Sequence, residues 1–149
     1  MAELTGYGVS VELPNGWDAR LYSRGGPDAP RAALHAATFP LPNERGDFGS
    51  GAVEMMGGDD VLVVLLEYDR AQTSQPLFAS AGAPTALDPA AFSPGALQRS
   101  RAGQAGAQAF FNANGRAFCL YAVIGRSADR DRLVAVANRV VAGIRIAAY

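Results

Sequence analysis

Residues 61–68 of the chain are Val61-Leu62-Val63-Val64-Leu65-Leu66-Glu67-Tyr68. The first six are apolar, and acidic residues stand on both sides of the run, at Asp59-Asp60 and at Asp69. A short run that is apolar on both of its faces is typical of a strand covered on both sides. Residues 117–124 show the same pattern, so we expect two doubly covered strands in the core. We expect the acidic residues at the strand ends, Glu67 included, to lie in water.

Alternating apolar and polar residues predict further strands towards the N-terminus. The alternation runs through residues 7–13 and again through residues 17–22, and the turn-forming sequence Pro14-Asn15-Gly16 separates the two segments. Alternation gives a strand one apolar face, and such a turn between two strands favours a β-hairpin. Residues 31–41 predict a third strand, ended by the prolines at positions 40 and 42.

The second half of the chain predicts a hairpin and a helix. Apolar segments at 104–111 and 116–124 flank a loop that ends in Asn114-Gly115, which is a strong hairpin signal. In residues 127–142 apolar side chains recur at helical spacing opposite three arginines, and Gly143 follows as a stop. Residues 70–102 contain four prolines and predict a long connection with scattered turns.

These elements predict one domain over residues 1–149 with an α+β fold. The two doubly covered strands require cover on both sides, from the C-terminal amphipathic helix, the 50–57 segment and the 70–102 connection. We therefore expect a twisted, largely antiparallel sheet with helices on both faces, which is an α/β/α sandwich.

Composition excludes several kinds of function. The net charge is −1, which supplies no electrostatic footprint for nucleic acid. All 13 basic residues are arginines, so lysine-based catalysis is excluded, and a single cysteine excludes an internal disulfide. No apolar run approaches the ~20 residues of a membrane-spanning helix, and the first residues do not form a signal peptide. We expect a cytoplasmic protein without cofactor, metal site or membrane insertion.

Two groups of residues are candidates for chemistry. His35 and Cys119 are the one histidine and the one cysteine, so they alone could form a Cys-His nucleophile and base, although each also fits a structural place in an apolar strand. The loop residues Gly49, Ser50 and Gly51 precede a possible short helix, where free backbone amides could bind an anion. A simple turn with a helix cap explains the same glycines.

Exposed aromatic residues beside arginines are typical of protein-binding patches. Trp17 follows a turn, and Phe110 and Phe111 must point to opposite faces of one strand, so that one of them could reach the surface. With Arg99 and Arg101, these three aromatic residues form the candidate partner face.

The segment Leu13-Pro14-Asn15-Gly16-Trp17 after an early strand, with a late doubly covered strand and a closing amphipathic helix, resembles the PsbP-like superfamily. That superfamily includes photosystem extrinsic subunits, Ran-binding factors, bacterial lipoproteins and chaperones of secretion effectors. The resemblance implies an α/β/α sandwich that binds other proteins without catalysis, and it transfers no site residue.

The sequence thus favours a non-catalytic protein-binding module, an adaptor or a chaperone-like accessory protein, whose partner is another protein. Two alternatives stay open: a small-ligand-binding protein or hydrolase-type enzyme that uses His35 and Cys119, and a structural subunit of a homo-oligomer.

Overall fold

The computed structural model describes residues 1–148. Its strands and helices follow one another along the chain as β1 (Ala2–Gly6), β2 (Val9–Leu13), β3 (Asp18–Ser23), β4 (Ala32–Ala37), η1 (Val53–Met55), β5 (Val61–Glu67), η2 (Arg70–Ser74), η3 (Pro76–Phe78), η4 (Pro89–Ala91), η5 (Pro94–Ala96), β6 (Ala105–Ala113), β7 (Arg116–Ile124), η6 (Ser127–Asp129), α1 (Arg130–Val141) and β8 (Arg145–Ile146). The elements labelled η are 3₁₀-helices of three to five residues.

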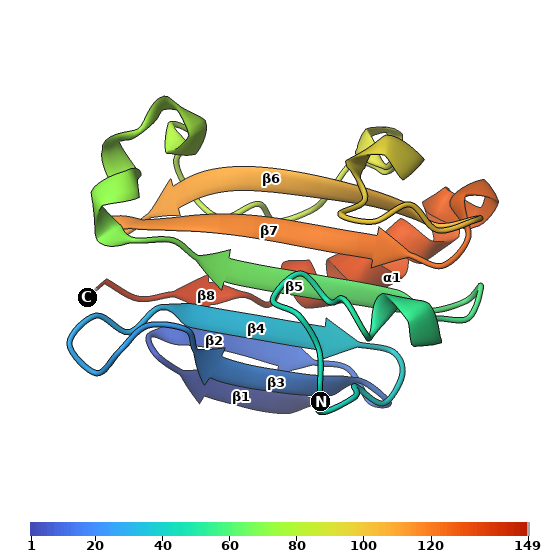
Figure 1. Ribbon diagram of the computed structural model, residues 1–149, viewed down its shortest axis with the longest axis horizontal. Coiled ribbons are helices and arrows are strands. Elements are labelled where there is room, and N and C mark those ends of the chain that lie inside the picture. The colour runs from blue at the N-terminus through green and yellow to red at the C-terminus, as the bar shows by residue number, and fades with distance from the viewer. Residues whose placement is uncertain (149) are drawn as a thin grey trace.

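The strands form two sheets. The larger sheet has five strands in the order β3-β4-β5-β7-β6, and the smaller has three in the order β1-β2-β8. All strand pairs within both sheets are antiparallel. Figure 1 shows α1 behind the large sheet and the loop that follows β4 in front of it.

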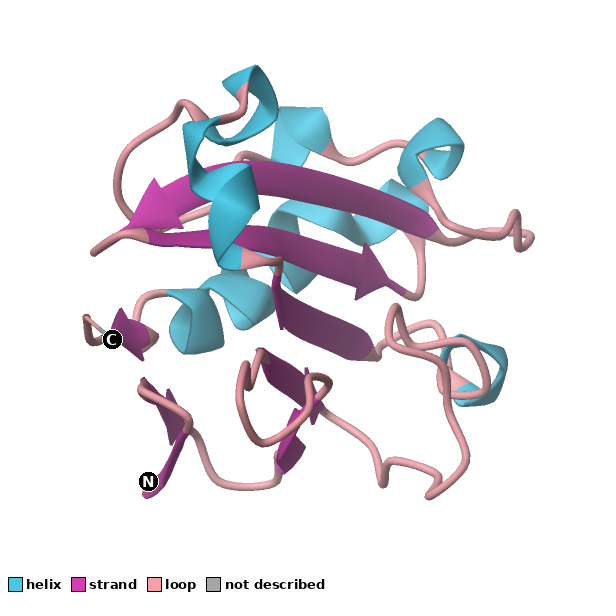
Figure 2. Cartoon of the chain, turned by 60° about the vertical axis from the view of Figure 1, so that its left-hand side comes forward, coloured by secondary structure: helices cyan, strands magenta, loops and turns pink. Residues whose placement is uncertain are grey.

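The two faces of the large sheet have different covers. One face packs against α1 and the small sheet, in a core that includes Leu65, Leu120, Val134 and Val11. The other face, which includes Val64, packs against the irregular segment 39–56 and has no α-helix on it. Figure 2 shows the loops and the short helical turns around the strands, with the turns coloured cyan like α1.

The predicted α/β/α sandwich with helices on both faces is therefore wrong. Within residues 1–148 there is one α-helix, and the structure is dominated by two antiparallel sheets. The reason lies in the connections. They are rich in proline and glycine, which interrupt helical hydrogen bonding, so the cover expected from the 50–57 and 70–102 segments consists of short 3₁₀-helices and loops.

The N-terminal hairpin also differs from the prediction. Residues 9–13 and 18–23 are strands, but they belong to different sheets. β2 pairs with β1 through a tight turn at Tyr7-Gly8, where both residues have positive φ, and β3 pairs with β4. Alternation predicts which face of a strand is apolar, but it does not identify the neighbouring strand.

Several local predictions are confirmed. β5 and β7 are buried along their whole length, and β6 and β7 form a hairpin around Asn114-Gly115. The amphipathic helix α1 is present, although it begins at Arg130 after a 3₁₀ turn, and Arg145–Ile146 form the short strand β8. Within residues 1–148, no helix has both the length and the apolar character needed to cross a bilayer.

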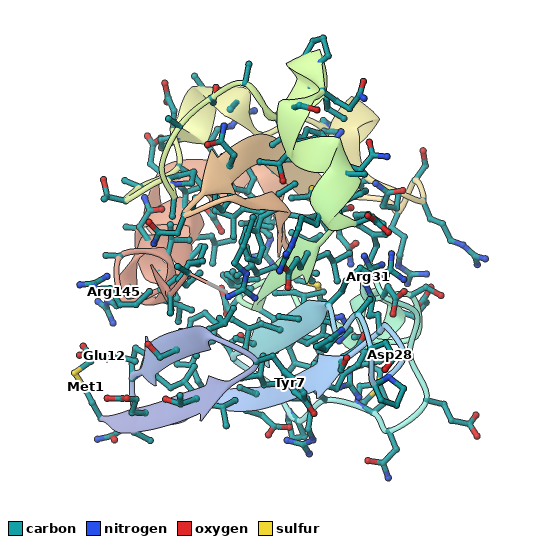
Figure 3. All side chains as sticks on the ribbon, turned by 90° about the vertical axis from the view of Figure 1, so that its left-hand side faces the viewer. Met1, Tyr7, Glu12, Asp28, Arg31 and Arg145 are labelled. Atoms are coloured by element: carbon teal, nitrogen blue, oxygen red, sulfur yellow. The ribbon has the colours of Figure 1, made fainter. Side chains whose placement is uncertain are left out.

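Glu67 is fully buried, so the expectation that it lies in water is wrong. Its carboxylate accepts two hydrogen bonds from Arg116, from Nε at 3.0 Å and from Nη2 at 2.8 Å. Arg116 also donates to the carbonyl oxygens of Tyr7, Gly8 and Ala147. This ion pair joins the large sheet to one end of the small sheet, near Tyr7 in Figure 3.

Candidate functional site

A cavity of about 220 Å³ opens where the segment 48–53, the loop 97–104 and β7 meet. It is lined by Phe48, Ser50, Val53, Leu97, Gln98, Arg99, Gln104 and Tyr121. We call it the Gln104 cavity. A volume of this size corresponds to roughly seven water molecules or one small organic molecule.

Close packing of a glycine-rich loop shapes one wall of this cavity. Gly49 has φ +86°, and a Cβ at this position would overlap Leu62 Cδ2. The absence of a side chain lets the loop lie directly on β5, which places Phe48 edge-on to the Tyr121 ring with their centroids 5.7 Å apart. The two rings form a rigid aromatic side of the cavity.

One residue of the lining, Gln104, carries a polar atom without a partner. The Gln104 side chain is 5% exposed, and its Nε2 donates a 2.8 Å hydrogen bond to the carbonyl oxygen of Val53. This bond sets the orientation of the amide, because a carbonyl only accepts. Gln104 Oε1 is buried and has no hydrogen-bond partner among residues 1–148. A buried acceptor without a donor costs about 1–3 kcal/mol.

Tyr121, which also lines the cavity, carries a second buried polar group. Its hydroxyl oxygen accepts a 2.9 Å hydrogen bond from the backbone N–H of Gln98. Burial raises the pKa of the Tyr121 phenol, so the hydroxyl keeps its proton. The lining residues therefore include a phenol that keeps its proton and an amide whose oxygen is closed to solvent.

Arg99 lies at the exposed mouth of the cavity. It forms no ion pair with any described residue, and no acidic residue lines the cavity. The acidic residues on either side of the lining segment are already engaged: Asp47 accepts hydrogen bonds from Tyr22 and Arg24, and Glu54 accepts one from Gly51 N at 2.6 Å. The mouth of the cavity is thus electropositive.

The anion site predicted at Gly49, Ser50 and Gly51 is not formed as expected. The N–H of Gly49 donates to the Gly46 carbonyl, and the N–H of Gly51 donates to Glu54, so a carboxylate of the chain already occupies the position of an anion. The helix that follows is a single 3₁₀ turn. Ser50 instead lines the Gln104 cavity.

The structure does not bring the candidate partner face together. Phe111 is 2% exposed inside the core, so it is not available to a partner, and Phe110 is half-buried against other aromatic rings. Trp17 is half-buried and directly precedes β3, at the opposite edge of the large sheet from β6. These edges are four strand spacings apart, about 19 Å. Arg99 and Arg101 are exposed on the loop before β6.

His35 and Cys119 do not form a catalytic pair. His35 lies on β4 and Cys119 on β7, with β5 between these two strands. Cys119 is also two residues along β7 from the position level with His35, so the backbones of the two residues are roughly 12 Å apart. Burial raises the pKa of the Cys119 thiol to about 12, which leaves it protonated and unreactive.

His35 instead holds the loop 42–48 on the sheet. Its Nε2–H donates to the carbonyl oxygen of Asp47 at 2.7 Å, and Arg45 Nε donates to its Nδ1 at 2.6 Å. The Asp47 side chain accepts from Tyr22 at 2.9 Å and from Arg24 at 3.2 Å. Burial lowers the pKa of His35 to about 4, so the imidazole is neutral in this network.

The sequence did not point to Gln104 or to Tyr121 as site residues. Gln104 stands at the start of a strand, where a polar residue is ordinary, and Tyr121 has the position of a core aromatic residue. Only the unpaired Oε1 of Gln104, which is a property of the folded chain, distinguishes the site.

No protein-family model, curated protein or solved structure matches this chain. The PsbP-like resemblance therefore stays a prediction. Among residues 1–148, no three His, Cys, Asp or Glu side chains are grouped so that they could hold a metal ion.

Proposed function

We propose that this protein binds a small organic ligand in the Gln104 cavity. The observation that carries the proposal is the lining of this cavity, in which apolar side chains, those of Phe48, Val53 and Leu97, are joined by a few polar ones. Small-molecule sites combine apolar walls with a few convergent polar groups in this way.

The energetic argument rests on the burial of apolar surface. The lining residues Phe48, Val53 and Leu97 supply apolar surface for the body of the ligand. The cavity is below the ~300 Å³ of sites for drug-sized ligands, so we propose a ligand of roughly ten non-hydrogen atoms.

Protein binding, which the sequence favours, stays a prediction. The residues of the candidate partner face do not form one surface, because they lie on separate edges of the large sheet or in the core. The one cysteine is free and buried, which supports the cytoplasm as the proposed location.

A fragment screen monitored by ¹H–¹⁵N NMR on the full chain tests the proposal. We expect compounds of about ten non-hydrogen atoms with a hydrogen-bond donor to shift the backbone amides of residues 48–53 and 97–104. Gln104→Met makes the cavity lining less polar while retaining the shape of the side chain, and it should weaken the binding of polar ligands about tenfold. Gln72→Met, at an exposed position of η2 outside the cavity, is the matched control.

Binding that leaves these amides unchanged, or that Gln104→Met and Gln72→Met affect equally, would overturn the proposal. Because Gln104→Met also removes the hydrogen bond to Val53, both variants are first compared with the parent protein by urea denaturation.

A further inference from the structure

The chain contains two Asn-Gly pairs, Asn15-Gly16 and Asn114-Gly115, and both lie in exposed turns. In an Asn-Gly pair the asparagine side chain reacts readily with the following backbone nitrogen, because glycine has no side chain to hinder the approach. We propose that Asn15 is a site of this covalent modification, which converts it to isoaspartate or aspartate, whereas the folded structure protects Asn114.

The reaction requires only water. Hydroxide removes the proton of the Gly16 nitrogen, and this nitrogen forms a bond to Asn15 Cγ. The Cγ–N bond of the side-chain amide breaks, and the amide nitrogen leaves as ammonia with a proton from water, which regenerates the hydroxide. Water then opens the resulting five-membered succinimide ring. Attack at Cγ yields aspartate, and attack at the backbone carbonyl carbon yields isoaspartate.

The attacking nitrogen is equally available in the two pairs. The backbone N–H groups of Gly16 and Gly115 donate no hydrogen bond to another residue within 1–148. Both glycines also have open space where a side chain would stand. A difference in reactivity must therefore come from the asparagine side chains and from the backbone on either side of them.

The two asparagine side chains are held differently. Asn114 Nδ2, which is the leaving group of the reaction, donates a 2.7 Å hydrogen bond to the carbonyl oxygen of Ile146. Asn15 is exposed, and its amide makes no hydrogen bond within the described part of the chain. Ring closure requires the side-chain amide to rotate onto the backbone nitrogen. One hydrogen bond of ordinary strength lowers the fraction that is free to rotate about fivefold.

The backbones of the two turns are also held differently. The turn at Asn114-Gly115 joins β6 to β7, and the ladder between these strands begins at the residues on either side of it. The turn at Asn15-Gly16 joins β2 to β3, which belong to different sheets. The hydrogen bond across it, from Trp17 N to the Pro14 carbonyl oxygen, is long at 3.4 Å. Local opening of this turn therefore breaks fewer contacts.

The modification would alter a connection between the two sheets. Isoaspartate adds a carbon atom to the main chain two residues before Trp17, which is half-buried and packs against the core. Either product also replaces a neutral amide by a carboxylate, so the net charge of the chain changes from −1 to −2. The modified protein should therefore separate from the parent protein by ion-exchange chromatography.

Peptide mapping by mass spectrometry tests the proposal on the full chain. Native protein and protein in guanidinium chloride are kept at pH 8 and then digested briefly with trypsin in mildly acidic buffer. Because the chain contains no lysine, trypsin cuts only after arginine and places the two sites in separate peptides, 1–20 and 102–116. Conversion adds about 1 Da to the peptide. Fragmentation of the peptides locates the change and distinguishes isoaspartate from aspartate.

In the native protein we expect Asn15 to convert at least about fivefold faster than Asn114, with isoaspartate among the products. In guanidinium chloride, where neither turn persists, the two residues should convert at similar rates. Asn15→Gln is the control. Its longer side chain does not form the five-membered ring, so peptide 1–20 of this variant should keep its mass.

Three results would overturn the proposal. Asn114 could convert as fast as Asn15 in the native protein, or Asn15 could stay unchanged over a time in which the denatured chain converts. The denatured chain could also show the same difference between the two sites as the native protein, which would assign the difference to local sequence and not to the fold.

Discussion

Replacement of Arg116 by methionine is expected to destabilise the protein strongly, because Arg116 neutralises a fully buried carboxylate. Its side chain is 3% exposed and that of Glu67 is 0% exposed. Among residues 1–148 it donates two hydrogen bonds to Glu67 and three to backbone carbonyls. A guanidinium has five N–H donors. Methionine retains much of the apolar stem and removes all five donors.

The size of the loss in unfolding free energy depends on the hydrogen bonds that Glu67 keeps after Arg116 is replaced. Glu67 would keep the hydrogen bond from Ala32 N at 2.9 Å, but its buried charge would lose the bidentate partner. Removal of one member of a buried ion pair costs about 3–5 kcal/mol. The carbonyls of Tyr7, Gly8 and Ala147 belong to exposed residues, so water can replace most of what they lose. We therefore expect a loss of about 4 kcal/mol, a large share of the 5–15 kcal/mol typical of a domain.

Urea denaturation followed by far-ultraviolet circular dichroism measures this loss. With a slope of about 2 kcal/mol per molar urea, the midpoint should fall by about 2 M. Glu67→Gln combined with Arg116→Met removes the unpaired charge, so the double variant should be more stable than Arg116→Met alone. Arg132→Met, which breaks an exposed ion pair with Asp59 at 2.8 Å, is the control and should leave the midpoint nearly unchanged.

Two results would refute this reasoning. If Arg116→Met lowers the urea midpoint by less than about 0.5 M, the buried pair contributes no more to stability than a surface ion pair. A double variant that is less stable than Arg116→Met would mean that the charge of Glu67 is not what the arginine neutralises.

Three further predictions concern His35, Gly49 and Cys119. Burial lowers the pKa of His35 to about 4, whereas an unfolded histidine takes up its proton near pH 6.5, so stability should fall by about 3 kcal/mol as the pH drops from 6.5 to 4. Urea midpoints over this range should show a clearly smaller fall for His35→Gln. Gly49→Ala should be less stable than Gly16→Ala, because both have positive φ, which costs about 1–2 kcal/mol, but only Gly49 would collide with a neighbour; equal urea midpoints would contradict this. Cys119 should resist Ellman's reagent in the native protein at pH 8 and react fully in urea, and rapid native reaction would contradict its burial.

The candidate site was predictable only in part. The sequence pattern indicated Arg99 as part of a partner face and Ser50 as part of an anion loop, whereas in the structure both line one cavity. Gln104 gave no signal, because its significance depends on the Val53 carbonyl, which lies 51 residues away along the chain and takes its amide hydrogen bond. An unpaired oxygen atom is defined by its surroundings and cannot be inferred from residue type.

The sequence by itself determined the features that depend on neighbours in the chain. The apolar runs at 61–66 and 117–124 determined two buried strands, Asn114-Gly115 determined the β6–β7 turn, and the spacing of apolar residues determined α1. Each depends on backbone conformation or side-chain periodicity over fewer than about twenty residues.

Only the tertiary structure decided which strands lie side by side and what covers each face of the large sheet. Alternation predicted β2 and β3 as strands, yet it could not show that β2 joins β1 and β8 in a second sheet. The position of Glu67 at the end of an apolar run indicated a carboxylate in water. Its partner Arg116 is 49 residues away along the chain, so the local sequence does not reveal the buried ion pair. The physical reason is the same in each case: periodicity specifies which side of a segment avoids water, whereas the pairing of distant segments depends on how all of those sides are buried together.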